Sequence, residues 1–192
     1  VDMLGLNFVR TFFERCELNT VVSNSVGLTL GLGTVEVTIL SHTIAYSVFA
    51  HNGMKFYPVF IKEIRDAEGL LLYDYHLYQQ KEQVVDPKVA YVTMHMLKGV
   101  CIPDPSLGYY PTGHRASALK RPVGGKTGTT NNCRDAWFCG FTTDYTTVVW
   151  VGYKDNRSLG RGVNYTGGRL ACPIWVDFMM FAEKDLPVRD FT

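Results

Sequence analysis

Apolar residues recur every three or four positions in four stretches of the chain, which is the spacing of an amphipathic helix. These stretches cover residues 3–16, 38–53, 86–99 and 173–184. Thr38 and Asp86 are capping residues at two of the starts, and a proline suited to the first helical turn follows Asp86. In the last stretch Ile174, Phe178 and Phe181 form the apolar stripe of an amphipathic helix.

Four other runs are rich in strand-forming residues. The segment 56–75 predicts a hairpin, because two such runs flank the turn sequence "DAEG". The runs "DAWFCGFTT" and "YTTVVWVGYK" are joined around Asp144 and are apolar on both faces, which is typical of a sheet that is covered on both sides. The Gly-, Pro- and Ser-rich segment 100–125 predicts a long loop. The order of elements favours an α+β fold with an antiparallel sheet.

Composition narrows the possible partners. The chain has 192 residues, 46% of them hydrophobic and 19% charged, which suits one domain with a core. A formal net charge of +1 favours neither nucleic acid nor a membrane surface as a partner. No apolar run approaches the roughly 18 residues that a membrane span needs. Because the chain starts at Val1 without a secretory signal, we expect it to be part of a longer protein whose targeting signals lie upstream.

Cysteine and histidine do not indicate a metal site. The five cysteines lack C-x-x-C spacing, and the five histidines show no ligand spacing. We expect the cysteines to be small buried hydrophobic residues, and we expect no cofactor. His114 lies in the predicted loop, where it is expected to be a solvated side chain rather than a substrate contact.

The stretch "RPVGGKTGTTNN", residues 121–132, allows three interpretations. A phosphate-binding loop needs a glycine where Lys120 stands and a helix after the motif, but a strand pattern follows. A K-T-G box of penicillin-interacting serine enzymes needs a strand with one lysine, small glycines and hydroxyl groups, and all of these are present. The third interpretation is a Gly-rich turn with a solvated lysine.

The surrounding sequence makes the second interpretation specific. The run "RPVGGKTGTTNNCRDAWFCGFTTDYTTVVWVGYKDNRSLG" resembles the transpeptidase domain of class A penicillin-binding proteins. The runs "LGTVEVTILSHTIAYSVFAHNG" and "GGRLACPIWVDFM" are similar to the same family, in the same order, so the resemblance covers about 32–179. It implies the penicillin-binding protein/β-lactamase-like serine transpeptidase fold, with an antiparallel sheet flanked by helices.

The resemblance also implies a function. In this family a serine attacks the D-Ala-D-Ala end of a peptidoglycan stem peptide, and β-lactams trap the acyl-enzyme. We therefore expect a D,D-transpeptidase at the extracytoplasmic face of the inner membrane, with stem peptides and β-lactams as partners. Lys126 is expected to organise charge and protons, and the Thr129 backbone N–H to form half of the oxyanion hole. The expected substrate-binding residues are Lys126, Thr127, Gly128, Thr129 and Thr130.

Two boxes of the family, S-x-x-K and S-x-N, have no convincing match. The opening "VDMLGLNFVRTFF" resembles the helix that follows S-x-N. We therefore expect residues 1–192 to be the C-terminal portion of one transpeptidase domain, without the nucleophile, the upstream strands, any glycosyltransferase domain or a membrane anchor. Alone, such a chain is expected to be inactive. "SALK", Ser117 to Lys120, formally fits S-x-x-K, but Pro122 follows closely and favours a surface loop.

Other functions share the K-T-G box. A D,D-carboxypeptidase and a β-lactamase-like hydrolase are the enzymatic alternatives, and a non-catalytic penicillin-binding-like remnant is an alternative of another class. Asp135 and Trp137 lie beside the box on one face of a predicted strand, where packing is expected to be their role.

Overall fold

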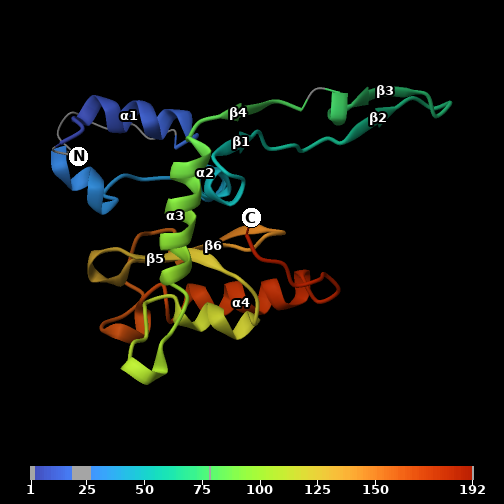
Figure 1. Ribbon diagram of the computed structural model, residues 1–192. Coiled ribbons are helices and arrows are strands. Elements are labelled where there is room, and N and C mark those ends of the chain that lie inside the picture. The colour runs from blue at the N-terminus through green and yellow to red at the C-terminus, as the bar shows by residue number, and fades with distance from the viewer. Residues whose placement is uncertain (1–2, 19–26, 78, 192) are drawn as a thin grey trace.

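The structure is a computed structural model that describes residues 3–18, 27–77 and 79–191 (Figure 1). Its α-helices are α1 (Leu6–Arg15), α2 (Ile39–Ala50), α3 (Pro87–Gly99) and α4 (Ala171–Ala182). They confirm the four helices predicted from apolar spacing. The Thr38 side chain accepts a hydrogen bond from the backbone N–H of Ser41, and Asp86 caps α3 by accepting from Lys88 and Val89. Among the described helices none is both long and apolar enough to cross a bilayer.

In the described ranges, the strands form one three-stranded sheet and two short ribbons. The three-stranded sheet is antiparallel, in the order β5 (Gly124–Thr129), β6 (Asp135–Phe141) and β7 (Thr146–Gly152). One ribbon pairs β1 (Met54–Phe56) with β4 (Lys81–Gln83), and the other pairs β2 (Glu63–Arg65) with β3 (Leu71–Asp74). Helices and antiparallel strands confirm the predicted α+β class.

Helices cover both faces of the three-stranded sheet, as its apolar sequence predicted. On one face Phe138 of β6 packs edge-on against Trp175 of α4, with ring centroids 5.2 Å apart. On the other face Trp137 packs edge-on against His42 of α2 at 5.3 Å. Because neighbouring residues of a strand point to opposite faces, β6 contributes to both contacts.

Helix α4 buries a different face from the one that the sequence suggested. Ile174, Phe178 and Phe181 are 51%, 51% and 72% exposed, so the predicted stripe faces outward. The buried side carries Ala171, Cys172, Trp175, Val176 and Met179. Apolar residues surround this helix, so periodicity alone could not select the buried side. The Trp175 indole selects it by filling the core and donating a hydrogen bond to the Thr147 carbonyl at 3.0 Å.

The segment 100–125 is more ordered than the predicted loop. It contains the short 3₁₀ helices η3 (Pro105–Leu107) and η4 (His114–Leu119), and β5 begins before it ends. Ala116 of η4 is fully buried in the cluster that surrounds Trp175. The composition predicted a loop because short 3₁₀ turns use the same residues as irregular connections.

The β2–β3 hairpin, together with residues 57–62 that lead into it, projects from the rest of the molecule as a narrow arm (Figure 1). The Asp66 carboxylate accepts from the backbone N–H groups of Glu68 and Leu70, and Gly69 has a φ of 87°. These contacts confirm the turn that "DAEG" predicted. Every residue of the two strands is exposed or half-buried, so local turn chemistry rather than a core sets this hairpin.

Most of the buried apolar residues that the structure describes belong to two clusters. One surrounds Trp175 and Phe138 between α4, η4 and the sheet, and the other surrounds Val48 and Ala90 between α2 and α3. Helix α3 runs between the upper and lower parts of the molecule in Figure 1 and leads directly to Cys101 in the lower cluster. It therefore joins the two clusters, and it also lies against β5.

Candidate active site on the K-T-G strand

The K-T-G box lies in the middle of β5, which is an edge strand of the three-stranded sheet. Lys126 stands opposite Cys139 of β6, and its ammonium donates a hydrogen bond to the carbonyl of Thr127 at 2.8 Å. The side chain is exposed, and no carboxylate among the described residues forms an ion pair with it. Its positive charge is therefore available to an anionic ligand.

The backbone of β5 presents donors and acceptors to its open edge. Beyond the strand, the N–H of Thr130 donates to the Asp135 carbonyl at 3.1 Å, continuing the register with β6. In an antiparallel ladder such pairs alternate, so the N–H and C=O groups of Thr127 and Thr129 point away from β6. The contact of the Lys126 ammonium with the Thr127 carbonyl fits this direction. The open edge therefore carries the Thr129 N–H that was predicted to face an oxyanion.

The two threonine side chains lie on the opposite face from Lys126, because side chains alternate along a strand. The Thr127 hydroxyl donates to the Thr112 hydroxyl at 2.8 Å, and the Thr129 hydroxyl accepts from the backbone N–H of Gly167 at 3.0 Å. The box therefore presents a cation from one face and fixed hydroxyl groups from the other. The Thr112 and Gly167 partners were not predicted from the sequence.

Gly167 and Gly168 let the segment before α4 approach β5 closely. A Cβ atom on Gly167 would lie 2.2 Å from the Trp137 carbonyl oxygen and 2.5 Å from that of Gly128. A Cβ atom on Gly168 would lie 2.3 Å from the Thr112 carbonyl oxygen. Only glycine fits at these distances. The adjacent glycines ahead of the last helix were the one sequence signal that could have revealed this support.

The two ends of β5 are held by polar side chains. At its end, the Thr130 hydroxyl donates to the Asp135 carboxylate at 3.0 Å, and the Trp150 indole donates to the same carboxylate at 2.9 Å. Asp135 therefore has a structural role, in line with its prediction. Before the strand, the Arg121 guanidinium lies 3.0 Å from the Glu183 carboxylate and donates to the Glu183 carbonyl at 3.1 Å.

His42 and Cys139 lie close together on the Lys126 face of the sheet. The His42 Nδ1 and Cys139 Sγ atoms are 3.9 Å apart. Burial lowers the pKa of His42 and raises the pKa of Cys139 to about 12, so both groups are neutral near pH 7. They add no charge beside the lysine. Cys139 is buried as the sequence predicted, whereas Cys133, in the turn after β5, is only half-buried.

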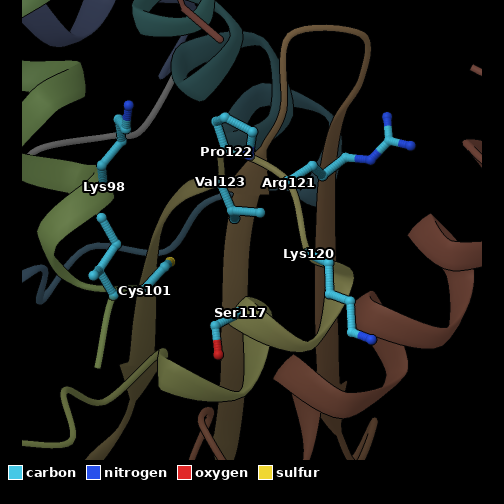
Figure 2. Close-up of a pocket in the computed structure, with 8 residues that line it drawn as sticks. Lys98, Cys101, Ser117, Lys120, Arg121, Pro122 and Val123 are labelled. Atoms are coloured by element: carbon cyan, nitrogen blue, oxygen red, sulfur yellow. The ribbon is translucent and has the colours of Figure 1, made fainter. Parts of the chain in front are cut away.

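Ser117 and Lys120, which formally fit the S-x-x-K box, do not form a pair of nucleophile and proton acceptor. The Ser117 hydroxyl donates to the His114 carbonyl at 2.7 Å, and Lys120 ends η4 in the left-handed conformation with φ 57°. Both line a pocket of about 390 Å³, in which the Lys120 side chain extends away from Ser117 (Figure 2). The prediction that His114 is solvated was wrong. The side chain is half-buried, and its Nδ1 atom lies 2.8 Å from the Pro111 carbonyl oxygen. Within the described ranges no His, Cys, Asp and Glu cluster could hold a metal ion.

Comparison with known proteins identifies the family of the chain. The family model described as "Penicillin binding protein transpeptidase domain" matches residues 17–180. The chain is 41% identical over 182 residues to penicillin-binding protein 1A of Aquifex aeolicus, covering 91% of this chain and 24% of that protein. It is 32% identical to penicillin-binding protein 1A of Pseudomonas aeruginosa, covering 96% and 27%. The chain therefore spans about a quarter of the length of these relatives.

Solved structures show the same fold. The crystal structure of penicillin-binding protein 1A from Haemophilus influenzae superposes with a TM-score of 0.84 at 27% identity, over 100% of this chain and 33% of that one. PonA1 from Mycobacterium tuberculosis, solved in complex with penicillin V, gives a TM-score of 0.76 at 23% identity, over 93% and 50%, and so supports the fold alone. With the family model covering most of its length, the chain belongs to the penicillin-binding protein transpeptidase domain family.

Proposed function

We propose that this chain forms the K-T-G wall of a serine D,D-transpeptidase that cross-links peptidoglycan stem peptides ending in D-Ala-D-Ala and is acylated by β-lactams. One observation carries the proposal: β5 is an open edge strand that presents the Lys126 ammonium, two fixed threonine hydroxyls and an outward Thr129 N–H together. Peptidoglycan is the substrate, so the site faces the extracytoplasmic side of the cell membrane.

The open edge suits an extended peptide end. A peptide that adds to β5 as a further strand gains backbone hydrogen bonds from Thr127 and Thr129. The ammonium of Lys126 attracts its terminal carboxylate, and the Thr129 hydroxyl, which accepts from Gly167 and keeps its own proton, donates to that carboxylate. The Thr129 N–H then points at the oxygen of the reacting carbonyl, where it stabilises the negative charge that develops on that oxygen. Lys126, Thr127, Gly128, Thr129 and Thr130 form this wall, with Thr130 acting through its contact with Asp135.

The nucleophile is proposed to come from residues outside this chain. Among the described residues, no serine hydroxyl is hydrogen-bonded to a lysine or histidine side chain that could accept its proton. Acyl transfer needs the nucleophile, the proton acceptor and the oxyanion donors within mutual reach. We therefore expect the 192-residue chain to be one part of the transpeptidase domain and to be inactive alone.

The test is Lys126→Ala in the complete protein, with acylation by a fluorescent β-lactam as the measurement. Loss of a charge-assisted contact worth about 1.5 to 3 kcal/mol should slow acylation roughly 10- to 100-fold. Ser117→Ala is the matched control and should acylate at the wild-type rate. An unchanged rate in Lys126→Ala, or a β-lactam adduct on the 192-residue chain alone by intact mass, would contradict this assignment.

Transfer and hydrolysis can be separated in the same protein. A transpeptidase passes the acyl group to an added amine acceptor, whereas a carboxypeptidase or β-lactamase passes it to water. We expect the aminolysis product to increase with acceptor concentration at the expense of the hydrolysis product. Product ratios that do not respond to the acceptor would favour the hydrolase.

A further inference from the structure

A second hollow lies just beyond the end of the K-T-G strand. The segment 131–134, which follows β5, and the segment 153–162, which follows β7, enclose a volume of about 460 Å³. Its lining includes Arg134, Arg157 and Arg161, and no acidic residue among those described. We call this site the arginine hollow.

Hydrogen bonds between the two segments fix the shape of the arginine hollow. The Ser158 hydroxyl donates to the Asn132 carbonyl at 2.7 Å, and the Leu159 N–H donates to the Cys133 carbonyl at 2.8 Å. Asn132, Cys133 and Asn156 have positive φ values of 61°, 49° and 56°. Such conformations cost free energy and persist where surrounding contacts enforce them, a pattern that clusters at binding sites.

The charge of the arginine hollow is only partly neutralised. Arg157 lies over the ring of Tyr153, 3.9 Å from its centroid, and its Nε atom is 3.7 Å from the Asp155 carboxylate. In the part of the chain that the structure describes, no ion pair or hydrogen bond engages the side chains of Arg134 and Arg161. Two of the residues that line the hollow therefore carry guanidinium groups with free donors, and the planar fork of a guanidinium fits a carboxylate in a bidentate contact.

The arginine hollow and the K-T-G box are within reach of one ligand. Asn132 of the hollow is three positions after Thr129, so their Cα atoms lie within about 11 Å of each other. Asp135 and Thr130 hold the turn that joins them. If the reacting carbonyl of a peptide lies at Thr129, the peptide residues that extend past Thr129 along the edge of β5 would lie at the hollow.

We propose that the arginine hollow binds a side-chain carboxylate of the peptide substrate while the peptide lies along β5. This inference rests on the proposed function, because it assigns a second anchor to the same substrate. A peptide is favoured over an anionic lipid surface because the hollow is local and adjoins the open strand, while the chain as a whole has a net charge of only +1.

The test compares two synthetic peptides that end in D-Ala-D-Ala and differ only in one side-chain carboxylate or its amide. The complete wild-type protein should show a lower KM for the acidic peptide, by roughly 3- to 10-fold, since both arginines are exposed and screened by solvent. In the double variant Arg134→Gln/Arg161→Gln the ratio of the two KM values should fall to about one. Higher salt should reduce the wild-type preference as well.

A matched variant and a second ligand complete the test. Lys184→Gln removes an exposed charge at the C-terminal end of α4, outside the hollow, and should keep the wild-type preference. Binding to vesicles containing phosphatidylglycerol should be the same in wild type and double variant.

A preference for the acidic peptide that survives in the double variant, or vesicle binding that is lost in the double variant, would overturn the inference. A wild-type protein that no β-lactam acylates would instead overturn the proposed function.

Discussion

The sheet with α4 and the β2–β3 arm achieve order in different ways. Around the sheet, Phe138 and Trp175 are fully buried, and contacts join segments that are far apart in the sequence. In the arm, Phe60 and Leu72 are 82% and 61% exposed, and the turn alone sets the pairing. The site lies on the first of these regions. Its geometry therefore depends on long-range packing, whereas the arm could change without moving it.

The largest expected effect is that of Trp175→Ala. Removing the indole leaves a cavity between α4 and β6 and deletes its hydrogen bond to the Thr147 carbonyl, so the free energy of unfolding should fall by about 3 to 5 kcal/mol. Phe60→Ala in the arm also removes an aromatic ring. Because that ring is exposed, the free energy of unfolding should change by less than about 0.5 kcal/mol. Urea unfolding of both variants measures the contrast, and similar losses would erase the distinction between the two regions.

Gly140→Ala tests how tightly the sheet packs. A Cβ atom there would lie 2.6 Å from a ring carbon of Phe138 and 2.8 Å from one of Trp175. We expect a loss of about 1 to 3 kcal/mol, because neither buried ring can move away. Gly99→Ala is the control, since no atom lies within 4 Å of its added Cβ. If thermal unfolding shows equal stability for both variants, the core is looser than described.

Gly69→Ala should destabilise the arm alone. Its φ of 87° is unfavourable for alanine, and the cost of about 1 kcal/mol falls on a hairpin without buried residues. Hydrogen exchange of the Asp66 and Tyr75 amides, which bond Leu70 and Lys62, should accelerate about 5-fold. The midpoint of global unfolding should not move. A shifted midpoint would show that the arm is coupled to the rest of the molecule.

The smallest expected effect is a difference in pH dependence. Burial raises the pKa of Glu183 above its usual 4.5. Between pH 4.5 and the higher pKa of the folded state, the folded chain therefore binds more protons than the unfolded chain. Its contribution to stability is present below pH 4.5 and is lost as pH rises through the folded pKa. In the arm, the hydrogen bond from Arg65 lowers the pKa of the exposed Glu63. The stability that this hydrogen bond contributes is present above the unfolded-state pKa of Glu63, and it is lost as pH falls through the lower folded-state pKa.

Unfolding measured against pH, at low and high salt, separates the two carboxylates. Glu183→Gln should remove the decline in stability above pH 4.5, and salt should alter it little because the group is buried. Glu63→Gln should affect only amide exchange in the arm, and added salt should mask its effect. A salt-sensitive decline that persists in Glu183→Gln would assign the pH dependence to other groups.

The sequence predicted the elements whose signals are local. Thr38 and Asp86 marked the starts of α2 and α3, because a cap acts on the next few residues. The buried side of α4 was predicted wrongly, since only Trp175 and its distant neighbours determine it. The K-T-G box was found because its residues are adjacent. The contact of Thr129 with Gly167, 38 positions away, and the arginine hollow arise from packing between distant segments, which no local pattern encodes.

The alternation of Lys126 with Thr127 and Thr129 makes the site sensitive to register. A slip of one residue between β5 and β6 would move the ammonium to the hydroxyl face and turn the Thr129 N–H toward β6. The glycine contacts oppose such a slip, because Gly167 fits against Gly128 and Trp137 in this pairing. Inserting or deleting one residue within β5 should therefore disable the site more completely than any single substitution in it, even if the sheet still forms.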